Sequence, residues 1–492
     1  MENKAKIGTV YPPIKEVEFD GKEMFFGKKM YLSIAKKYYV KTQIKLFKEL
    51  FNNFTAGISK LTVIQREDDQ PVVYVSKEIE NVELPLELGD NDYAIAIDDK
   101  KAQLVFSDNK SFAHAYCTML AVLEIKETKK GKEKFSLPIC TIKDKPVVKF
   151  RSAHLSVLYG NFFQRTRKLV REIGFLKYTH VIIAFKGGNF PWKSFKEYGR
   201  KEHYSIKQVR TIIEEANALG MDVIPELNIW GHASMSTGRY GKHIALDQNP
   251  KVAPYFNKTG WVWNILSPEV KELHHKMIEE LIDVCGPCEY FHVGCDESVT
   301  FGEDRDYIGK DRTKIVCDYI NDMANWLKQK GRKTMIWGDM LLCNPEWKEI
   351  LQSGESPEEV RRTCEMLDKE IIVIDWQYDV ATHVDLPSTK SISDYGFKTM
   401  IAPWRSPVAI KICADNVIRH GYAGYVQTTW GIIISEICIL ARGAIATWED
   451  AEKSLAESEM KIMMNMGEFI RKLLPPKGSY LLSGTKKREI VE

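Results

Sequence analysis

The chain has 492 residues, 44% hydrophobic and 28% charged, which is ordinary for a globular protein long enough for two domains. Its 70 basic and 67 acidic residues leave a formal charge of +3, which gives no basis for a nucleic-acid or membrane partner. No segment approaches 18 uninterrupted apolar residues, and the first residues lack the apolar core of a signal peptide. We therefore expect a cytoplasmic protein without a membrane span.

Residues 1–145 combine short strand-like runs with amphipathic segments. PVVYVS, YAIAID and AQLVFS are typical of strands, whereas 33–51 and 111–124 have the apolar spacing of helices. This mixture predicts a small α+β domain. The domain is expected to end near residue 145, because strands and helices begin to alternate regularly after TIKDKPVVKFR.

Residues 146–475 alternate between strand-like and helical segments. Helical segments such as 205–220, 312–331 and 407–421 end in Gly, which favours helix termination just before a strand. Eight such units in about 300 residues predict an α/β fold, a (βα)8 barrel, with a doubly wound sheet as the alternative. Residues 476–492 are expected to form a C-terminal tail. The eight strand-like runs lie at 149–157, 179–185, 221–229, 289–295, 333–340, 370–378, 399–404 and 423–430.

The ends of these runs carry acids and tryptophans. In a barrel of this kind the reacting side chains lie at the C-terminal ends of the strands. The fourth run ends in adjacent Asp296 and Glu297, a repulsive pair that costs stability unless a function uses it. Aromatic faces beside a few acids favour a sugar site. The other rim candidates are Arg151 on the first run, Glu226, Asn228, Trp230 and His232 on the third, Trp337 and Asp339 on the fifth, Trp376, Tyr378 and Asp379 on the sixth, Trp404 on the seventh and Trp430 on the eighth.

The adjacent positions of Asp296 and Glu297 limit the chemistry they can perform. Neighbouring residues of a strand point in opposite directions, so the two carboxyls do not easily flank a glycosidic bond as an ordinary retaining pair does. A substrate with a 2-acetamido group offers another route, because its own carbonyl oxygen can attack the anomeric carbon. The protein then supplies one acid for the leaving oxygen and one carboxylate for the acetamido nitrogen.

HVGCDE (292–297) resembles the His-x-Gly-Gly-Asp-Glu signature of glycoside hydrolase family 20, the β-N-acetylhexosaminidases, which use this substrate-assisted route. Four further segments are similar to family motifs, and residues 1–145 look like the small domain that precedes the family's barrel. The resemblance implies a retaining exo-β-N-acetylhexosaminidase without cofactor or metal, acting on glycans with a terminal N-acetylhexosamine. The further segments are VKFRS (148–152), VIPELNIWGHA (223–233), TMIWGDM (334–340) and TTWG (428–431).

The resemblance also implies a role for each rim residue. Glu297 is expected to be the general acid and base, Asp296 to hold the acetamido nitrogen, and His232 to tune the protonation of Glu297. Arg151 is expected to bind hydroxyls of the terminal sugar. The remaining expected substrate contacts are Trp337, Asp339, Trp376, Tyr378, Trp404 and Trp430.

Several positions depart from the family pattern. Lys186 and two glycines follow the second run, where the family often has acids, and Lys186 suggests room for a negatively charged substituent. Asn228 replaces a common Asp, and Cys295 replaces a Gly. Two other readings stay open: a catalytically weak sugar-binding or regulatory protein on the same barrel, and a metal-dependent hydrolase that uses His232.

The segment Cys285-Gly286-Pro287-Cys288 has the spacing of a redox motif. A redox cysteine pair stands at the start of a helix, whereas this segment follows the predicted helix 267–284. Gly and Pro are typical helix-stop residues, so we interpret the segment as a helix end. The ten cysteines are expected to be mostly reduced core thiols.

Overall fold

The computed structural model describes residues 10–25, 27–78, 87–88, 92–127, 133–157, 162–185, 190–198, 203–234, 249–430 and 436–475. The predicted tail at 476–492 and Lys186 lie outside these residues, so the predictions made for them stay predictions.

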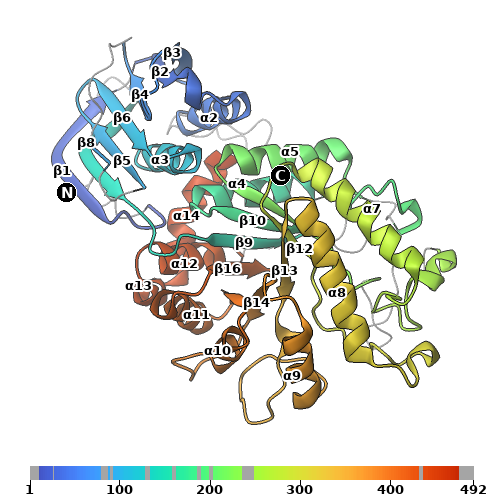
Figure 1. The fold of residues 1–492 in the computed structure, drawn as a ribbon. Coiled ribbons are helices and arrows are strands. Elements are labelled where there is room, and N and C mark those ends of the chain that lie inside the picture. The colour runs from blue at the N-terminus through green and yellow to red at the C-terminus, as the bar shows by residue number, and fades with distance from the viewer. Residues whose placement is uncertain are drawn as a thin grey trace.

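The N-terminal part of the chain forms a mixed sheet that lies beside the barrel (Figure 1). The strands are hydrogen-bonded in the order β1-β8-β5-β6-β4-β2-β3, and β7 pairs with β8. Two helices, α2 (Lys41–Phe54) and α3 (Asn109–Ala121), pack between this sheet and the outer helices of the barrel. The strands are β1 (Glu16–Phe25), β2 (Lys29–Ala35), β3 (Lys60–Arg66), β4 (Val72–Ser76), β5 (Tyr93–Ile97), β6 (Lys101–Phe106), β7 (Glu124–Glu127) and β8 (Glu133–Asp144).

Within the described residues, eight parallel strands close into a barrel, which confirms the predicted fold class. The ring closes because residues 425–429 of the last strand pair with residues 151–155 of the first. Each strand coincides with one of the eight predicted runs. The strands are β9 (Arg151–Ser156), β10 (His180–Ala184), β11 (Asp222–Glu226), β12 (Tyr290–His292), β13 (Lys333–Trp337), β14 (Ile372–Trp376), β15 (Lys398–Ala402) and β16 (Gly424–Thr429).

Helices form the outer layer of the barrel. α7 ends at Cys285, and Gly286 follows it with a positive φ of 74°, as expected for a helix stop. None of the described helices is long and apolar enough to cross a bilayer. The helices are α4 (Phe163–Phe175), α5 (Ile206–Ala218), α7 (Pro268–Cys285), α8 (Arg312–Gln329), α9 (Pro357–Met366), α10 (Pro387–Asp394), α11 (Pro407–His420), α12 (Glu436–Trp448), α13 (Ala451–Ala456) and α14 (Glu459–Leu473).

Side chains of the barrel strands alternate between two cores, and β13 illustrates this. Met335 and Trp337 pack inside the barrel with residues of β14 to β16, whereas Ile336 packs into the large core shared with the helices. Trp337 is 1% exposed, and it lies at the C-terminal end of its strand. The alternation therefore aims Trp337 into the barrel, directly below the rim.

Arg151 lies at the opposite end of the barrel from the rim, because β9 begins with it. Its guanidinium donates to the carbonyl oxygens of Val148 at 2.7 Å and Lys177 at 2.6 Å, and it stacks over the Trp448 ring. All of its contacts are with the base of the barrel. The prediction that Arg151 binds sugar hydroxyls is therefore wrong.

Candidate active site

The two acids Asp296 and Glu297 lie on a loop with an unusual backbone. After β12 ends at His292, Gly294, Cys295 and Glu297 take φ values of 69°, 75° and 48°. The left-handed region is costly for residues other than glycine, and such strain persists only where the surroundings impose it. His232, on the loop after β11, has the same feature at φ 49°. Strained backbone is thus found in the two loops that carry the predicted catalytic residues.

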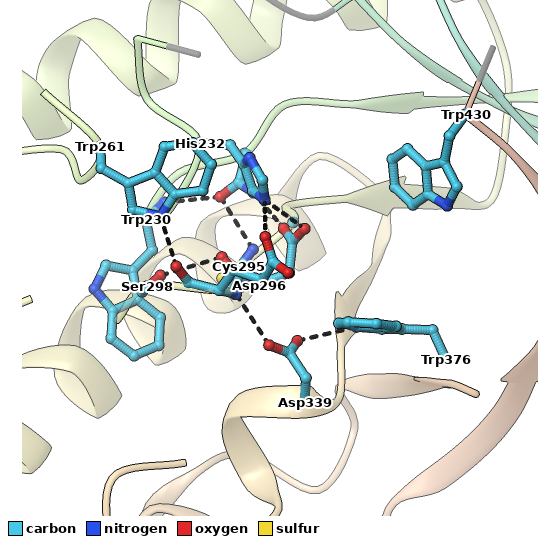
Figure 2. A network of polar contacts seen from close by, with 12 residues as sticks. Trp230, His232, Trp261, Cys295, Asp296, Ser298, Asp339, Trp376 and Trp430 are labelled. Carbon is cyan, nitrogen blue, oxygen red and sulfur yellow. Dashed lines mark hydrogen bonds and ion pairs between the residues drawn. The ribbon is translucent and has the colours of Figure 1, made fainter. Parts of the chain in front are cut away.

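Asp296 is buried, and both of its carboxylate oxygens are engaged. The amide of Asn228 donates to Oδ1, and Nε2 of His232 lies 3.0 Å from Oδ2 (Figure 2). Gly231 allows the His232 loop to approach this closely, because a Cβ on it would lie 2.2 Å from the carbonyl oxygen of Asp296. The carboxylate is therefore fixed in direction as well as in place.

Glu297 differs from its neighbour because its side chain is 46% exposed, against 8% for Asp296. Nε2 of His232 also lies 3.4 Å from Oε2 of Glu297, so one imidazole contacts both acids. The ring of His232 packs against Trp261 at a centroid distance of 4.3 Å, which supports its orientation. The pair therefore presents one open and one enclosed carboxyl, joined by a histidine.

The main chain of Glu297 is held on both sides. Its N–H donates to Oδ2 of Asp339 at 3.0 Å, and its carbonyl accepts from Nε1 of Trp261 at 2.6 Å. Asp339 also accepts from Nε1 of Trp376 at 3.1 Å, so it ties the acid loop to the aromatic rim. Burial, and then the charge of Asp296, raises the pKa of Asp339 to about 7. Asp339 therefore supports Glu297 from below.

Aromatic side chains from three strands line one side of the acids. Trp376 packs against Tyr378 at a centroid distance of 4.8 Å, and Tyr378 meets Trp404 edge-on at 5.6 Å. Nε1 of Trp430 donates to the hydroxyl of Tyr378 at 2.9 Å. Figure 2 places Trp376 and Trp430 on the side of the acids away from Trp230. These rings, half-buried at the rim, give flat apolar surfaces beside two carboxyls.

Trp337 closes the floor beneath the aromatic rim. It lies 4.7 Å from the ring of His292 and 6.2 Å from that of Trp430. Beside it, His154 of β9 meets the carboxylate of Glu226 at 3.0 Å, and both are buried. Glu226 and His292 thus belong to the barrel interior, under the site.

The structure brings together nine of the ten predicted site residues and leaves out Arg151. It adds Trp261, which lies in a segment without strand or helix periodicity that offered no signal in the sequence. It also gives Asn228 a direct contact with Asp296. The sequence placed Asn228 at a strand end but assigned it no role.

The described His, Cys, Asp and Glu side chains bear on the metal and redox alternatives. No group of three or more His, Cys, Asp or Glu side chains there is placed to hold a metal ion. Burial raises the pKa of the Cys288 thiol to about 11 and that of Cys285 further. A raised thiol pKa disfavours the reactive thiolate, and both thiols are free and buried.

Residues 182–409 match the model of the glycosyl hydrolase family 20 catalytic domain, a range that includes the acid pair and the third to seventh strands. This part of the barrel is similar to the catalytic domains of glycosyl hydrolase family 20. The match excludes β9 and β16, which the structure supplies to close the ring.

Two curated proteins are similar to parts of the chain. The chain is 24% identical over 270 residues to a lacto-N-biosidase of Bifidobacterium bifidum, covering 51% of this chain and 23% of that protein. It is 27% identical over 169 residues to hexosaminidase D of Bos taurus, covering 32% and 46%. The chain thus spans less than half the length of either relative.

Solved structures share the fold over nearly the whole chain. A family 20 exo-β-N-acetylglucosaminidase of Vibrio harveyi, solved with N-acetylglucosamine, superposes with a TM-score of 0.64 at 14% identity, covering 94% of this chain and 78% of that one. A β-N-acetylhexosaminidase of Bacteroides fragilis gives 0.63 at 15% identity, covering 94% and 96%. The sheet-plus-barrel architecture is therefore shared.

Proposed function

We infer that this protein is a retaining exo-β-N-acetylhexosaminidase that uses substrate-assisted catalysis. The observation that carries the inference is the contrast within the acid pair. Asp296 is enclosed with both oxygens engaged, whereas Glu297 is about half exposed. A carboxylate held on both oxygens suits orientation and charge stabilisation rather than attack on carbon, so the nucleophile comes from the substrate.

In the first step Glu297 donates its proton to the glycosidic oxygen as the bond to the anomeric carbon breaks. The acetamido carbonyl oxygen of the substrate forms the new bond to that carbon, giving an oxazolinium ring. Asp296 accepts a hydrogen bond from the ring nitrogen and stabilises the positive charge that develops there. The leaving sugar or alcohol departs with the proton.

In the second step the Glu297 carboxylate removes a proton from water as its oxygen attacks the anomeric carbon. The bond to the acetamido oxygen breaks, the acetamido group is restored, and the configuration is retained after two inversions. Trp376 and Trp430 offer apolar faces for the sugar ring. Asp339 and Trp261, through the Glu297 main chain, hold the acid at a constant place in both steps.

The test is a series of 4-nitrophenyl β-glucosaminides whose N-acyl group carries zero to three fluorines. Fluorine withdraws electrons from the carbonyl oxygen, so kcat/KM should fall steeply along the series. A flat series with active enzyme would mean that a protein side chain attacks the carbon. Absence of turnover on β-GlcNAc and β-GalNAc glycosides, with sugar binding intact by calorimetry, would favour the binding-protein alternative.

A further inference from the structure

Asn228 connects the loop after β11 to the loop that carries the acids. Its Oδ1 accepts from the N–H groups of Cys295 at 3.1 Å and Trp230 at 3.2 Å. Of the two polar atoms of the Asn228 amide, only the oxygen can accept a hydrogen bond from these N–H groups. Nδ2 must therefore face Asp296, to which it donates. The orientation of the amide is thus determined by two main-chain groups.

Asn228 also has little room to move. A Cβ on Gly294 would lie 2.3 Å from its Cγ, so the loop packs directly on the amide. The carbonyl oxygen of Asn228 accepts from Nε1 of Trp263 at 2.9 Å. Backbone and side chain are both held, and the contact with Asp296 is a built feature of the site.

The charges around Asp296 show why a neutral donor matters here. Among the described residues, His232 is the group beside Asp296 that can carry positive charge. Two further acids lie close to it: Glu297 shares the same imidazole, and the charge of Asp296 contributes to the raised pKa of Asp339. The same charge contributes to the raised pKa values of Tyr378 and Cys295, whose neutral forms are thereby favoured. One more acid in contact would add to this repulsion.

We propose that Asn228 is a positioning residue that keeps Asp296 ionised at neutral pH and so sets the upper pH range of the enzyme. The proposal rests on the function inferred above. An amide donates to the Asp296 carboxylate at every pH. An aspartate at position 228 would donate only while protonated, and would repel Asp296 once ionised. The neutral side chain therefore preserves the charge that the oxazolinium step needs.

The decisive variant is Asn228→Asp, which has nearly the same shape. Its carboxylate still accepts from Cys295 and Trp230, so the loop keeps those anchors. We expect kcat/KM at pH 7 to fall by roughly 10- to 100-fold, the usual cost of losing a hydrogen bond to a charged group, and to recover toward pH 5. Asn228→Ala should lose a similar factor at all pH values. Asn321→Asp, the same change in α8, is the matched control and should leave the profile unchanged.

A double-mutant cycle tests whether Asn228 acts through Asp296. Asp296→Asn alone removes the charge that stabilises the oxazolinium. If the two residues are coupled, adding Asn228→Asp to Asp296→Asn should cost much less than it costs in the wild type, and the acid shift should disappear. Additive losses would overturn the proposal, as would equal pH profiles for Asn228→Asp and Asn228→Ala.

If Asn228→Asp folds poorly at pH 7, the pH dependence of its melting temperature tests the same proposal. The melting temperature of this variant should then rise on acidification to pH 5, and that rise should be absent from the double variant with its single acid. A pH-independent loss of stability would contradict the proposal. The inferred function is judged separately, by wild-type turnover and the N-acyl series, neither of which involves Asn228.

Discussion

The two ends of the barrel both carry buried charges, and they arrange them in opposite ways. At the base, Lys177 meets Asp144 at 3.2 Å, and Tyr93 and Trp448 donate to the same carboxylate. At the rim, Asp296 and Glu297 share one histidine, and Asp339 contacts the main chain of Glu297. The base pairs opposite charges and joins the sheet to the barrel, whereas the rim concentrates like charges. Clustered like charges are the mark of a site in use.

Backbone strain separates the two ends in the same way. Lys177 also has a positive φ of 65°, but it lies two residues beyond α4, where a left-handed residue commonly ends a helix. His232, Cys295 and Glu297 take positive φ values within the loops that carry the functional groups. A charged residue at a strand end therefore does not by itself indicate a functional site. The charges around it and the conformation of its backbone distinguish a structural residue from a functional one.

The largest expected effect is at the base. Lys177→Met leaves the buried Asp144 carboxylate with its other hydrogen-bond donors but without the ammonium group that contacts it, and breaking such a pair costs about 3–5 kcal/mol. Chemical denaturation should show this loss in the free energy of unfolding, with kcat of the folded fraction unchanged. Lys314→Met, in an exposed pair with Asp318, is the control and should leave the stability nearly unchanged. A loss of kcat in Lys177→Met would mean that the base communicates with the site.

Glu172 of α4 is a buried acid outside the candidate active site, so it tests the effect of burial alone. Burial raises its pKa to about 8, and Oε1 has no hydrogen-bond partner among the described residues. The Glu172 carboxyl ionises near pH 4.5 in the unfolded chain but only near pH 8 in the folded protein. The wild type therefore loses stability as the pH rises from 4.5 to 8. Glu172→Gln should therefore gain a few kcal/mol over the wild type at pH 8 and little at pH 4.5. A gain that does not depend on pH would contradict the assigned titration.

Arg151→Lys is expected to have the smallest effect, and it separates the two ends most sharply. A lysine cannot reach the carbonyls of Val148 and Lys177 together, and leaving a buried carbonyl unsatisfied costs about 1–3 kcal/mol. The melting temperature should fall while kcat/KM stays unchanged. A tenfold or larger rise in KM, roughly 1.4 kcal/mol, at unchanged stability would restore Arg151 to the sugar site.

Much of the fold follows from local pattern. The barrel strands are buried on both faces and read as short apolar runs between helices, so all eight were recognisable. α10, α12 and α14 were not anticipated, because the Ser- and Thr-rich 387–394 and the nearly uniformly buried 436–448 lack a clear amphipathic stripe. In a parallel barrel the reacting side chains lie at the C-terminal ends of the strands, so the acids and tryptophans at those ends were predicted to lie on the rim.

The rest of the site depends on contacts that no local pattern encodes. Arg151 was misplaced because a charged residue within a strand-like run was taken for its end, whereas β9 begins there. Trp261 reaches the Glu297 carbonyl from an irregular segment, and Asn228 meets Asp296 across 68 positions. Such long-range contacts are set by tertiary packing, so they become visible only in the folded structure.

The most direct test of the account is release of 4-nitrophenol from its β-GlcNAc and β-GalNAc glycosides by the wild type and by Glu297→Gln. Glu303→Gln, an exposed acid on the same loop, serves as the control. The account predicts turnover by the wild type and the control, and a loss of roughly 10²–10⁴-fold in Glu297→Gln at unchanged melting temperature. Full activity of Glu297→Gln would contradict the assignment of the general acid.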